Sequence, residues 1–169
     1  MKFITLILFF ITLGFLAKAQ TVLPKTIVDV KVTSVEKMRK ILPQTTVVLY
    51  RDNKKIDSVV LEKGRYKVEI DTGYVYKIIF SKEGYVSKSI VVNTKDAPQK
   101  YKKRAKLKLD IGLFHQKEGL NVSFLRTEPI GYARYDFVSE KMEWDRDYLD
   151  KMKGKIVRAT LDYAKKKRK

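Results

Sequence analysis

Carboxylates are the side chains of this chain that could do acid, base or metal chemistry. Six of them gather within a short stretch: Asp136, Glu140, Glu143, Asp145, Asp147 and Asp150. Such a cluster could bind Ca²⁺ or supply an acid and a base, for which Asp136 and Glu143 are the pair to test. The ligand order of an EF-hand is missing, however, and Asp145 and Asp147 stand where a helix is expected to begin. Carboxylates there cap free N–H groups, so a helix start is the favoured interpretation.

Histidine and cysteine usage excludes several kinds of site. His115 is the only histidine, which rules out a His-rich metal site and any catalytic device that needs two imidazoles. The chain has no cysteine, so disulfides and thiolate metal sites are impossible. No nucleophile stands beside a base in a recognisable motif. We therefore expect no enzyme, no cofactor, and no catalytic or metal-binding residues.

Basic residues are in large excess, and two groups of them are candidates for contact with an anion or a protein partner. The candidates are Lys100, Lys102, Lys103, Arg104, Lys165, Lys166, Lys167, Arg168 and Lys169. The first four surround Tyr101, and an aromatic ring among cations can grip phosphates and stack on a base or sugar. The favoured interpretation of these four residues is nevertheless a solvated linker whose lysines guard the edge of the next strand.

The start of the chain predicts export. Lys2 is followed by an apolar run from Phe3 to Leu16 and by Ala17-Lys18-Ala19, the pattern of a cleaved signal peptide. A membrane anchor is the rival, but the run is shorter than a usual span. The net charge of +18 would otherwise suggest nucleic acid, which is not an expected partner outside the inner membrane. The remaining polyanions are acidic glycans and phosphorylated lipid heads, unless the lysines only keep the domain soluble.

Alternation of apolar and polar residues predicts a succession of short strands. The expected strands are 26–33, 45–50, 55–61, 65–70, 74–80, 86–92 and 105–113, with a further short one at Val122 and Phe124 and either a strand or an extended arm from Tyr132 to Phe137. Their spacing predicts a mostly β fold, an antiparallel β-sandwich of about seven strands with an extended arm. Apolar residues at helical spacing after Asp145 predict an amphipathic α-helix with a basic end. We expect its apolar stripe to dock on the sandwich; the alternative is an anionic membrane.

These elements divide the chain into four parts. Residues 1–19 are the expected signal peptide, 20–125 the β-sandwich, 126–145 the extended arm and 146–169 the basic helix. A mature chain of this length suits one domain with a core of its own.

Residues 26–93 carry a resemblance to a known family. The steps that carry it are Gly64-Arg65-Tyr66, the aromatic strand from Tyr74 to Phe80, and the turn Ser81-Lys82-Glu83-Gly84-Tyr85. This order resembles the carboxypeptidase-like regulatory domain, a transthyretin-type β-sandwich common in exported bacterial proteins. The resemblance implies a non-catalytic accessory module that serves stability, anchoring or docking on a partner or glycan.

Together these observations predict an exported, non-enzymatic β-sandwich adaptor or accessory protein of the bacterial cell envelope. We expect it in the periplasm, at the outer membrane or secreted, and acting by recognition of an envelope protein. The alternative is a binder of anionic glycan or phosphorylated lipid through its lysine-rich surfaces. The oligomeric state stays unassigned.

Overall fold

The computed structural model describes residues 25–37, 39–98 and 105–166, and the expected signal peptide lies outside them. These residues form nine strands, one 3₁₀ helix and one α-helix. The strands are β1 (Lys25–Ser34), β2 (Thr45–Arg51), β3 (Lys54–Leu61), β4 (Arg65–Asp71), β5 (Val75–Ser81), β6 (Lys88–Asn93), β7 (Lys106–Leu113), β8 (Gly131–Asp136) and β9 (Lys141–Trp144). The helices are η1 (Ser123–Arg126) and α1 (Arg146–Lys166).

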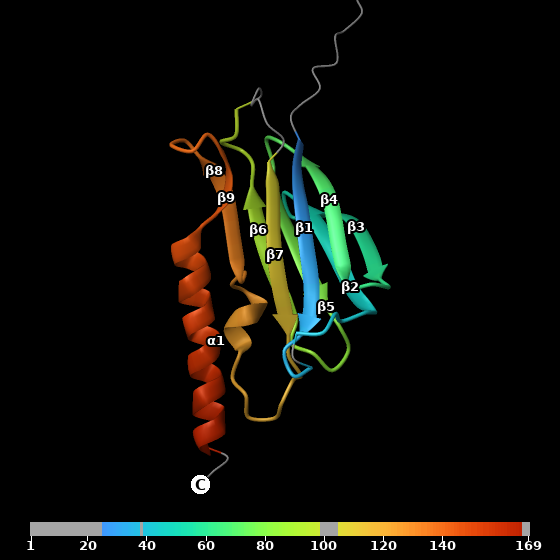
Figure 1. Ribbon diagram of the computed structural model, residues 1–169, viewed down its shortest axis with the longest axis vertical. Coiled ribbons are helices and arrows are strands. Elements are labelled where there is room, and N and C mark those ends of the chain that lie inside the picture. The colour runs from blue at the N-terminus through green and yellow to red at the C-terminus, as the bar shows by residue number, and fades with distance from the viewer. Residues whose placement is uncertain (1–24, 38, 99–104, 167–169) are drawn as a thin grey trace, which may run out of the picture.

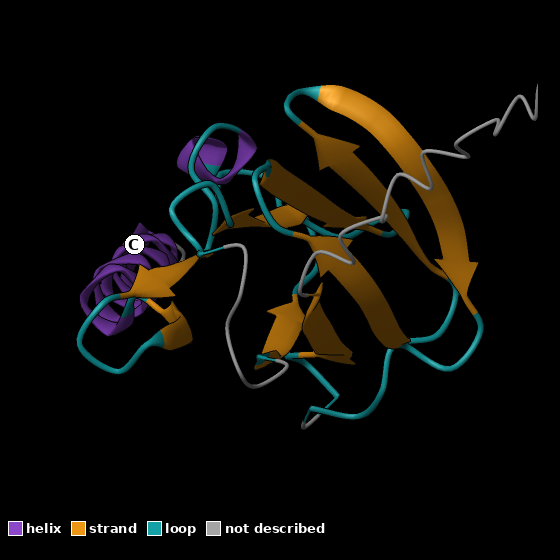
Figure 2. Ribbon diagram, turned by 90° about the horizontal axis from the view of Figure 1, so that it is seen from above, coloured by secondary structure: helices purple, strands orange, loops and turns teal. Residues whose placement is uncertain are grey.

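Two sheets face each other and confirm the predicted sandwich with its C-terminal helix (Figures 1 and 2). The smaller sheet has the order β4-β1-β7 and the larger one β3-β2-β5-β6-β8-β9. Two pairings are parallel, β1 with β7 and β6 with β8, so the sheets are mixed where sequence predicted antiparallel pairing throughout. The segment predicted as an extended arm contains β8 and β9, which widen the larger sheet.

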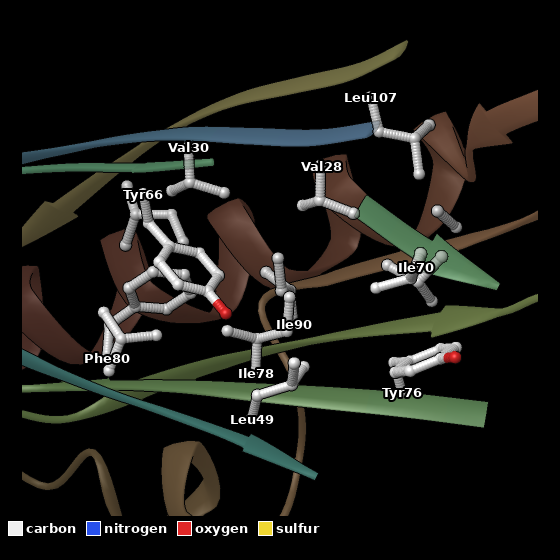
Figure 3. Packing of buried hydrophobic residues seen from close by; sticks show 14 of the residues in the cluster. Val28, Val30, Leu49, Tyr66, Ile70, Tyr76, Ile78, Phe80, Ile90 and Leu107 are labelled. Carbon is white, nitrogen blue, oxygen red and sulfur yellow. The ribbon is translucent and has the colours of Figure 1, made fainter. Parts of the chain in front are cut away.

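The core lies between the sheets. Alternate residues of β1 point into it, and Val28, Val30 and Val32 are fully buried. Figure 3 shows Val28 and Val30 opposite Ile78 of β5. The ring of Tyr66 meets that of Phe80 edge to face, with 6.2 Å between ring centres. The period-two pattern therefore predicted the correct inward faces.

Residues with positive φ form the turns that connect β2 to β3 and β3 to β4. Asp52 and Asn53 have φ of 46° and 67°, the left-handed conformations that form a two-residue hairpin loop between β2 and β3. Gly64, where the chain passes from β3 to β4, has φ of +58°. A β-carbon there would lie 2.6 Å from Cγ2 of Ile41 and 2.8 Å from the carbonyl oxygen of Leu42. Gly64 is thus required both by its backbone conformation and by lack of space.

Trp144 closes one side of the sandwich. It ends β9, and its indole Nε1–H donates to the carbonyl oxygen of Lys108 on β7, at 2.9 Å. The bond ties the last strand of the larger sheet to the last strand of the smaller one. On this side, therefore, the two sheets are linked across the gap between them.

The helix α1 docks on the protein over a second, smaller core. Met152 is its most buried residue, at 1% exposure, and packs with Val122 and Leu125 from the segment around η1. Lys155 pairs with Glu128 at 2.6 Å. The predicted docking of the helix is thus what the structure shows. The strand predicted at Val122 and Phe124 is wrong, because this segment turns as η1 to direct Val122 and Leu125 at the helix.

Asp145 begins the helix as the sequence predicted. Its carboxylate accepts the backbone N–H of Tyr148 at 3.0 Å, and Asp147 lies in the first turn. The hydroxyl of Tyr148 donates to the carbonyl oxygen of Pro129 at 2.9 Å, which fixes the start of the helix against the preceding segment.

Replacement of Gly64 by alanine is expected to destabilise the protein more than replacement of Gly73. Both have positive φ, but a β-carbon at Gly73 would have no neighbour within 4 Å. Gly73→Ala should therefore cost about 1 kcal/mol of unfolding free energy from backbone strain, and Gly64→Ala at least about 2 kcal/mol, because a clash is added. Urea unfolding followed by tryptophan fluorescence measures both. Equal losses would contradict the tight approach at Gly64.

Truncation of Met152 tests the docking of α1. Met152→Ala should lower the unfolding free energy by about 2–5 kcal/mol, because it opens a cavity in the second core. Leu161→Ala is the matched control, since Leu161 is 54% exposed on the same helix. Its effect should stay within about 0.5 kcal/mol. A Met152→Ala effect as small as the control's would mean that the helix does not pack there in solution.

Candidate functional site

The predicted basic contact residues are only partly described. Lys100, Lys102, Lys103, Arg104, Lys167, Arg168 and Lys169 lie outside the described residues. Lys165 and Lys166 form the last turn of α1 and are exposed. The C-terminal end of α1 lies at the end of the sandwich opposite to the start of β7 (Figure 1).

The carboxylate cluster is spread over β8, β9 and the start of α1. Asp136 accepts the backbone N–H groups of Ser139 at 2.6 Å and Val138 at 3.0 Å, and these bonds lower its pKa. The side chain of Lys141 lies 3.0 Å from Glu143 and lowers the pKa of that carboxyl. Neither carboxyl therefore has the raised pKa that is usual for a general acid.

His115 is engaged in structure. Its backbone N–H donates to Oε1 of Glu36 at 2.8 Å, and its ring lies on that of Tyr85 with 4.0 Å between centres. Partial burial opposes ionisation of Glu36, yet the N–H groups of His115 and of Glu36 itself lower its pKa. Within residues 25–37, 39–98 and 105–166, no three histidine or carboxylate side chains are grouped to bind a metal.

Lys88 is a buried amine that sequence reasoning missed. It lies on the inward face of β6, at 6% exposure, and its Nζ donates to the carbonyl oxygen of Gly112 on β7. The ammonium also lies 4.7 Å from the ring centre of Phe114. Burial lowers the pKa of Lys88 to about 8, although the negative charge of Glu36 acts to raise it. The sequence does indicate this burial, because Lys88 is two and four residues before the core residues Ile90 and Val92 and therefore points to the same face of the strand.

The edge strand β3 is the most exposed part of either sheet. Every residue from 54 to 60 is exposed, on both faces of the strand. Three of these are large apolar residues: Ile56 at 45%, Val59 at 39% and Val60 at 51%. Among the described strands only β2 pairs with β3, so its outer backbone groups have no sheet partner there.

The protection of this edge is uneven. Proteins commonly guard an edge strand with charges and bulges. Lys54, Lys55 and Asp57 supply charges to the first half of β3, and the pairing with β2 shifts register between Leu49 and Tyr50. The second half, residues 58–61, carries no charge. It offers an uncharged run to another strand.

The opposite edge of the larger sheet differs from β3. There β9 is short and Trp144 bonds across to β7, while α1 lies against β8. One end of the larger sheet is thus covered and the other is open (Figure 2). The sequence does indicate that β3 is an exposed edge, because residues 54–60 lack the alternation of apolar and polar residues seen in the other strands.

No protein-family profile matches the chain, and no curated protein does. The solved structures that are similar to part of the chain include two β-rich proteins. The 3-chlorocatechol 1,2-dioxygenase of Rhodococcus opacus 1CP is 9% identical, with a TM-score of 0.39 over 55% of this chain and 61% of that one. The TIE protein of Bacillus anthracis is 19% identical, with a TM-score of 0.41 over 54% of this chain and 17% of that one. Both neighbours are β-rich, and at these scores we transfer neither activity nor partner.

None of the described helices combines the length and the apolar character that crossing a membrane requires.

Replacement of Lys88 should change how stability depends on pH. Its pKa falls from 10.5 to about 8 on folding, so the unfolded state binds more protons between these values. Stability of the wild type should therefore rise with pH in this window, by roughly 3 kcal/mol relative to Lys88→Met. Unfolding free energies from denaturant titrations between about pH 7 and 10.5 give the difference. For Lys67→Met, at an exposed lysine of β4, the plot of unfolding free energy against pH should run parallel to that of the wild type. A Lys88→Met plot that also runs parallel to the wild type would contradict the burial of this amine.

Proposed function

We propose that this protein is an exported, non-enzymatic adaptor of the bacterial cell envelope that binds a protein partner by strand addition at β3. The observation that carries the proposal is an edge strand exposed on both faces, whose outer side has no described partner. In strand addition an extended segment pairs with such an edge through backbone hydrogen bonds, and alternate side chains give specificity.

The chemistry around β3 defines the partner segment. Ile56 and Val60 are exposed apolar contacts, which suit β-branched or aromatic side chains on the incoming strand. Cations exceed carboxylates by one on β3, β4 and the turn between them: Lys54, Lys55, Lys63, Arg65 and Lys67 against Asp57, Glu62, Glu69 and Asp71. An extended segment that alternates apolar and acidic residues fits this edge best.

The assignment to the envelope rests on the sequence. The pattern of residues 1–19 supports export. The resemblance of residues 26–93 to the carboxypeptidase-like regulatory domain supports an accessory role without catalysis, and the lowered pKa values of Asp136 and Glu143 are consistent with it. We place the protein in the periplasm, at the outer membrane or outside the cell.

A second candidate function is binding of anionic glycan or phosphorylated lipid through lysine-rich surfaces. The observation that favours it is the outward face of α1, where Val157 and Leu161 are 52% and 54% exposed. Exposed cations flank them: Lys151, Lys153, Arg158, Lys165 and Lys166. Such a face suits an anionic surface and would lose affinity as salt rises.

A pair of double variants tests the β3 proposal. A partner is first isolated from solubilised envelope with tagged protein, and its affinity is then measured in purified form. Ile56→Asp with Val60→Asp should weaken binding at least tenfold, because the apolar contacts are lost and the new carboxylates repel the acidic residues of the incoming segment. Hydrogen exchange of β3 amides should slow in the complex, since backbone pairing protects them.

The control is Val157→Asp with Leu161→Asp, which places the same changes on exposed residues of α1. It should leave affinity within about twofold, since surface changes away from a contact have small effects. An equal loss in both variants, or unchanged exchange in β3, contradicts strand addition. Failure to recover a stoichiometric partner at both low and high salt contradicts the adaptor itself, and a loss confined to the α1 variant would place the protein contact on α1 instead of β3.

A further inference from the structure

A cavity of about 380 Å³ lies against the outer face of the larger sheet. Its floor is made by β5 and β6, including Lys77, Ile79 and Ser89. Residues from the segment 116–126, with Asn121, Ser123 and Arg126 among them, form the opposite wall. The volume falls within the range of about 300–1,000 Å³ that is usual for small-molecule sites.

The second core holds this wall in place. Val122 and Leu125 line the cavity and are 5% and 3% exposed. They pack with Met152 of α1, and the ion pair of Lys155 with Glu128 fastens the helix just beyond η1. The cavity is therefore bounded by ordered residues and is formed before any ligand arrives.

The charge of the lining has one sign. Lys77 and Arg126 approach from the floor and the wall, and the lining contains no aspartate or glutamate. Neither of these cations has an ion-pair partner among the described residues. Lys88 also lines the cavity, but its ammonium is engaged by the carbonyl of Gly112. The two remaining cations favour a ligand that carries an anionic group.

The rest of the lining is rich in hydroxyl and amide groups. Ser87, Ser89, Ser123, Gln116 and Asn121 supply them. The Oδ1 atom of Asn121 accepts the hydroxyl of Ser123 at 2.9 Å, which leaves its N–H groups to donate. Such donors and acceptors match the hydroxyls of a sugar ring. The ring of Tyr85 and the side chain of Ile79 provide apolar surface for the C–H face of the ring.

We infer that this cavity binds an acidic sugar, a saccharide ring that bears a carboxylate or phosphate group. Lys77 and Arg126 hold the anionic group, and the serine and amide side chains bind the ring hydroxyls. The site is separate from β3, so this inference stands or falls independently of strand addition.

Direct binding to small probes tests the inference. Glucuronic acid and glucose 6-phosphate should each bind the purified protein saturably, observed by NMR shifts of residues around the cavity, whereas glucose and inorganic phosphate should each bind at least tenfold more weakly. Lys77→Gln with Arg126→Gln should weaken the acidic sugars at least tenfold, because charge-assisted hydrogen bonds are lost. Comparison of the two acidic probes shows whether carboxylate or phosphate is preferred.

Two further variants separate the site from general charge and from the fold. Arg39→Gln with Lys108→Gln removes the same charge from exposed positions away from the cavity and from α1, and should leave affinity within about twofold. Ser123→Trp fills the cavity at an exposed position without a change in charge, and should abolish binding while the unfolding transition is kept. The inference is overturned by equal losses in both glutamine variants, by glucose or phosphate binding as tightly as the acidic sugars, by unchanged binding in Ser123→Trp, or by no saturable binding.

Discussion

Each strand of the smaller sheet turns alternate side chains toward the larger sheet, and Val28, Val30 and Val32 of β1 are completely buried there. A chain without cysteine has no disulfide to constrain it, so this apolar contact must provide the stability. β1 lies between β4 and β7, and its side chains meet Ile78 and Phe80 of β5 across the core. The positions of both edges of the sandwich follow from this central contact.

The two sheets differ in width, and the difference creates the surfaces that we assign to function. Three strands cannot cover six. On one side β8 and β9 are covered by α1 and by the bond from Trp144 to β7, and a second core with a cavity beside it results. On the other side β3 extends without cover. The open edge and the cavity are thus two consequences of one mismatch.

Much of the fold was predictable from local pattern. The alternation in β1 and β7 predicted their inward faces, and Asp145 predicted the start of α1. Pairings between distant segments were not predictable, because alternation identifies a face but not a neighbour; β6 with β8 is an example. Val122 stands just before the helical turn η1, and its position depends on packing with Met152, far along the chain. The cavity escaped prediction for the same reason, since Lys77 and Arg126 line one cavity only in the folded chain.

The parallel pair of β1 and β7 has a consequence for how the protein folds. Ile27 pairs with Lys106, so β1 acquires this neighbour only after most of the chain has been made. Contacts between residues so distant in sequence slow folding, because a long loop must close before they form. Until then the backbone edge of β1 that pairs with β7 is open to other strands. In the nascent chain this edge is therefore a site at which β1 can mispair before β7 is available.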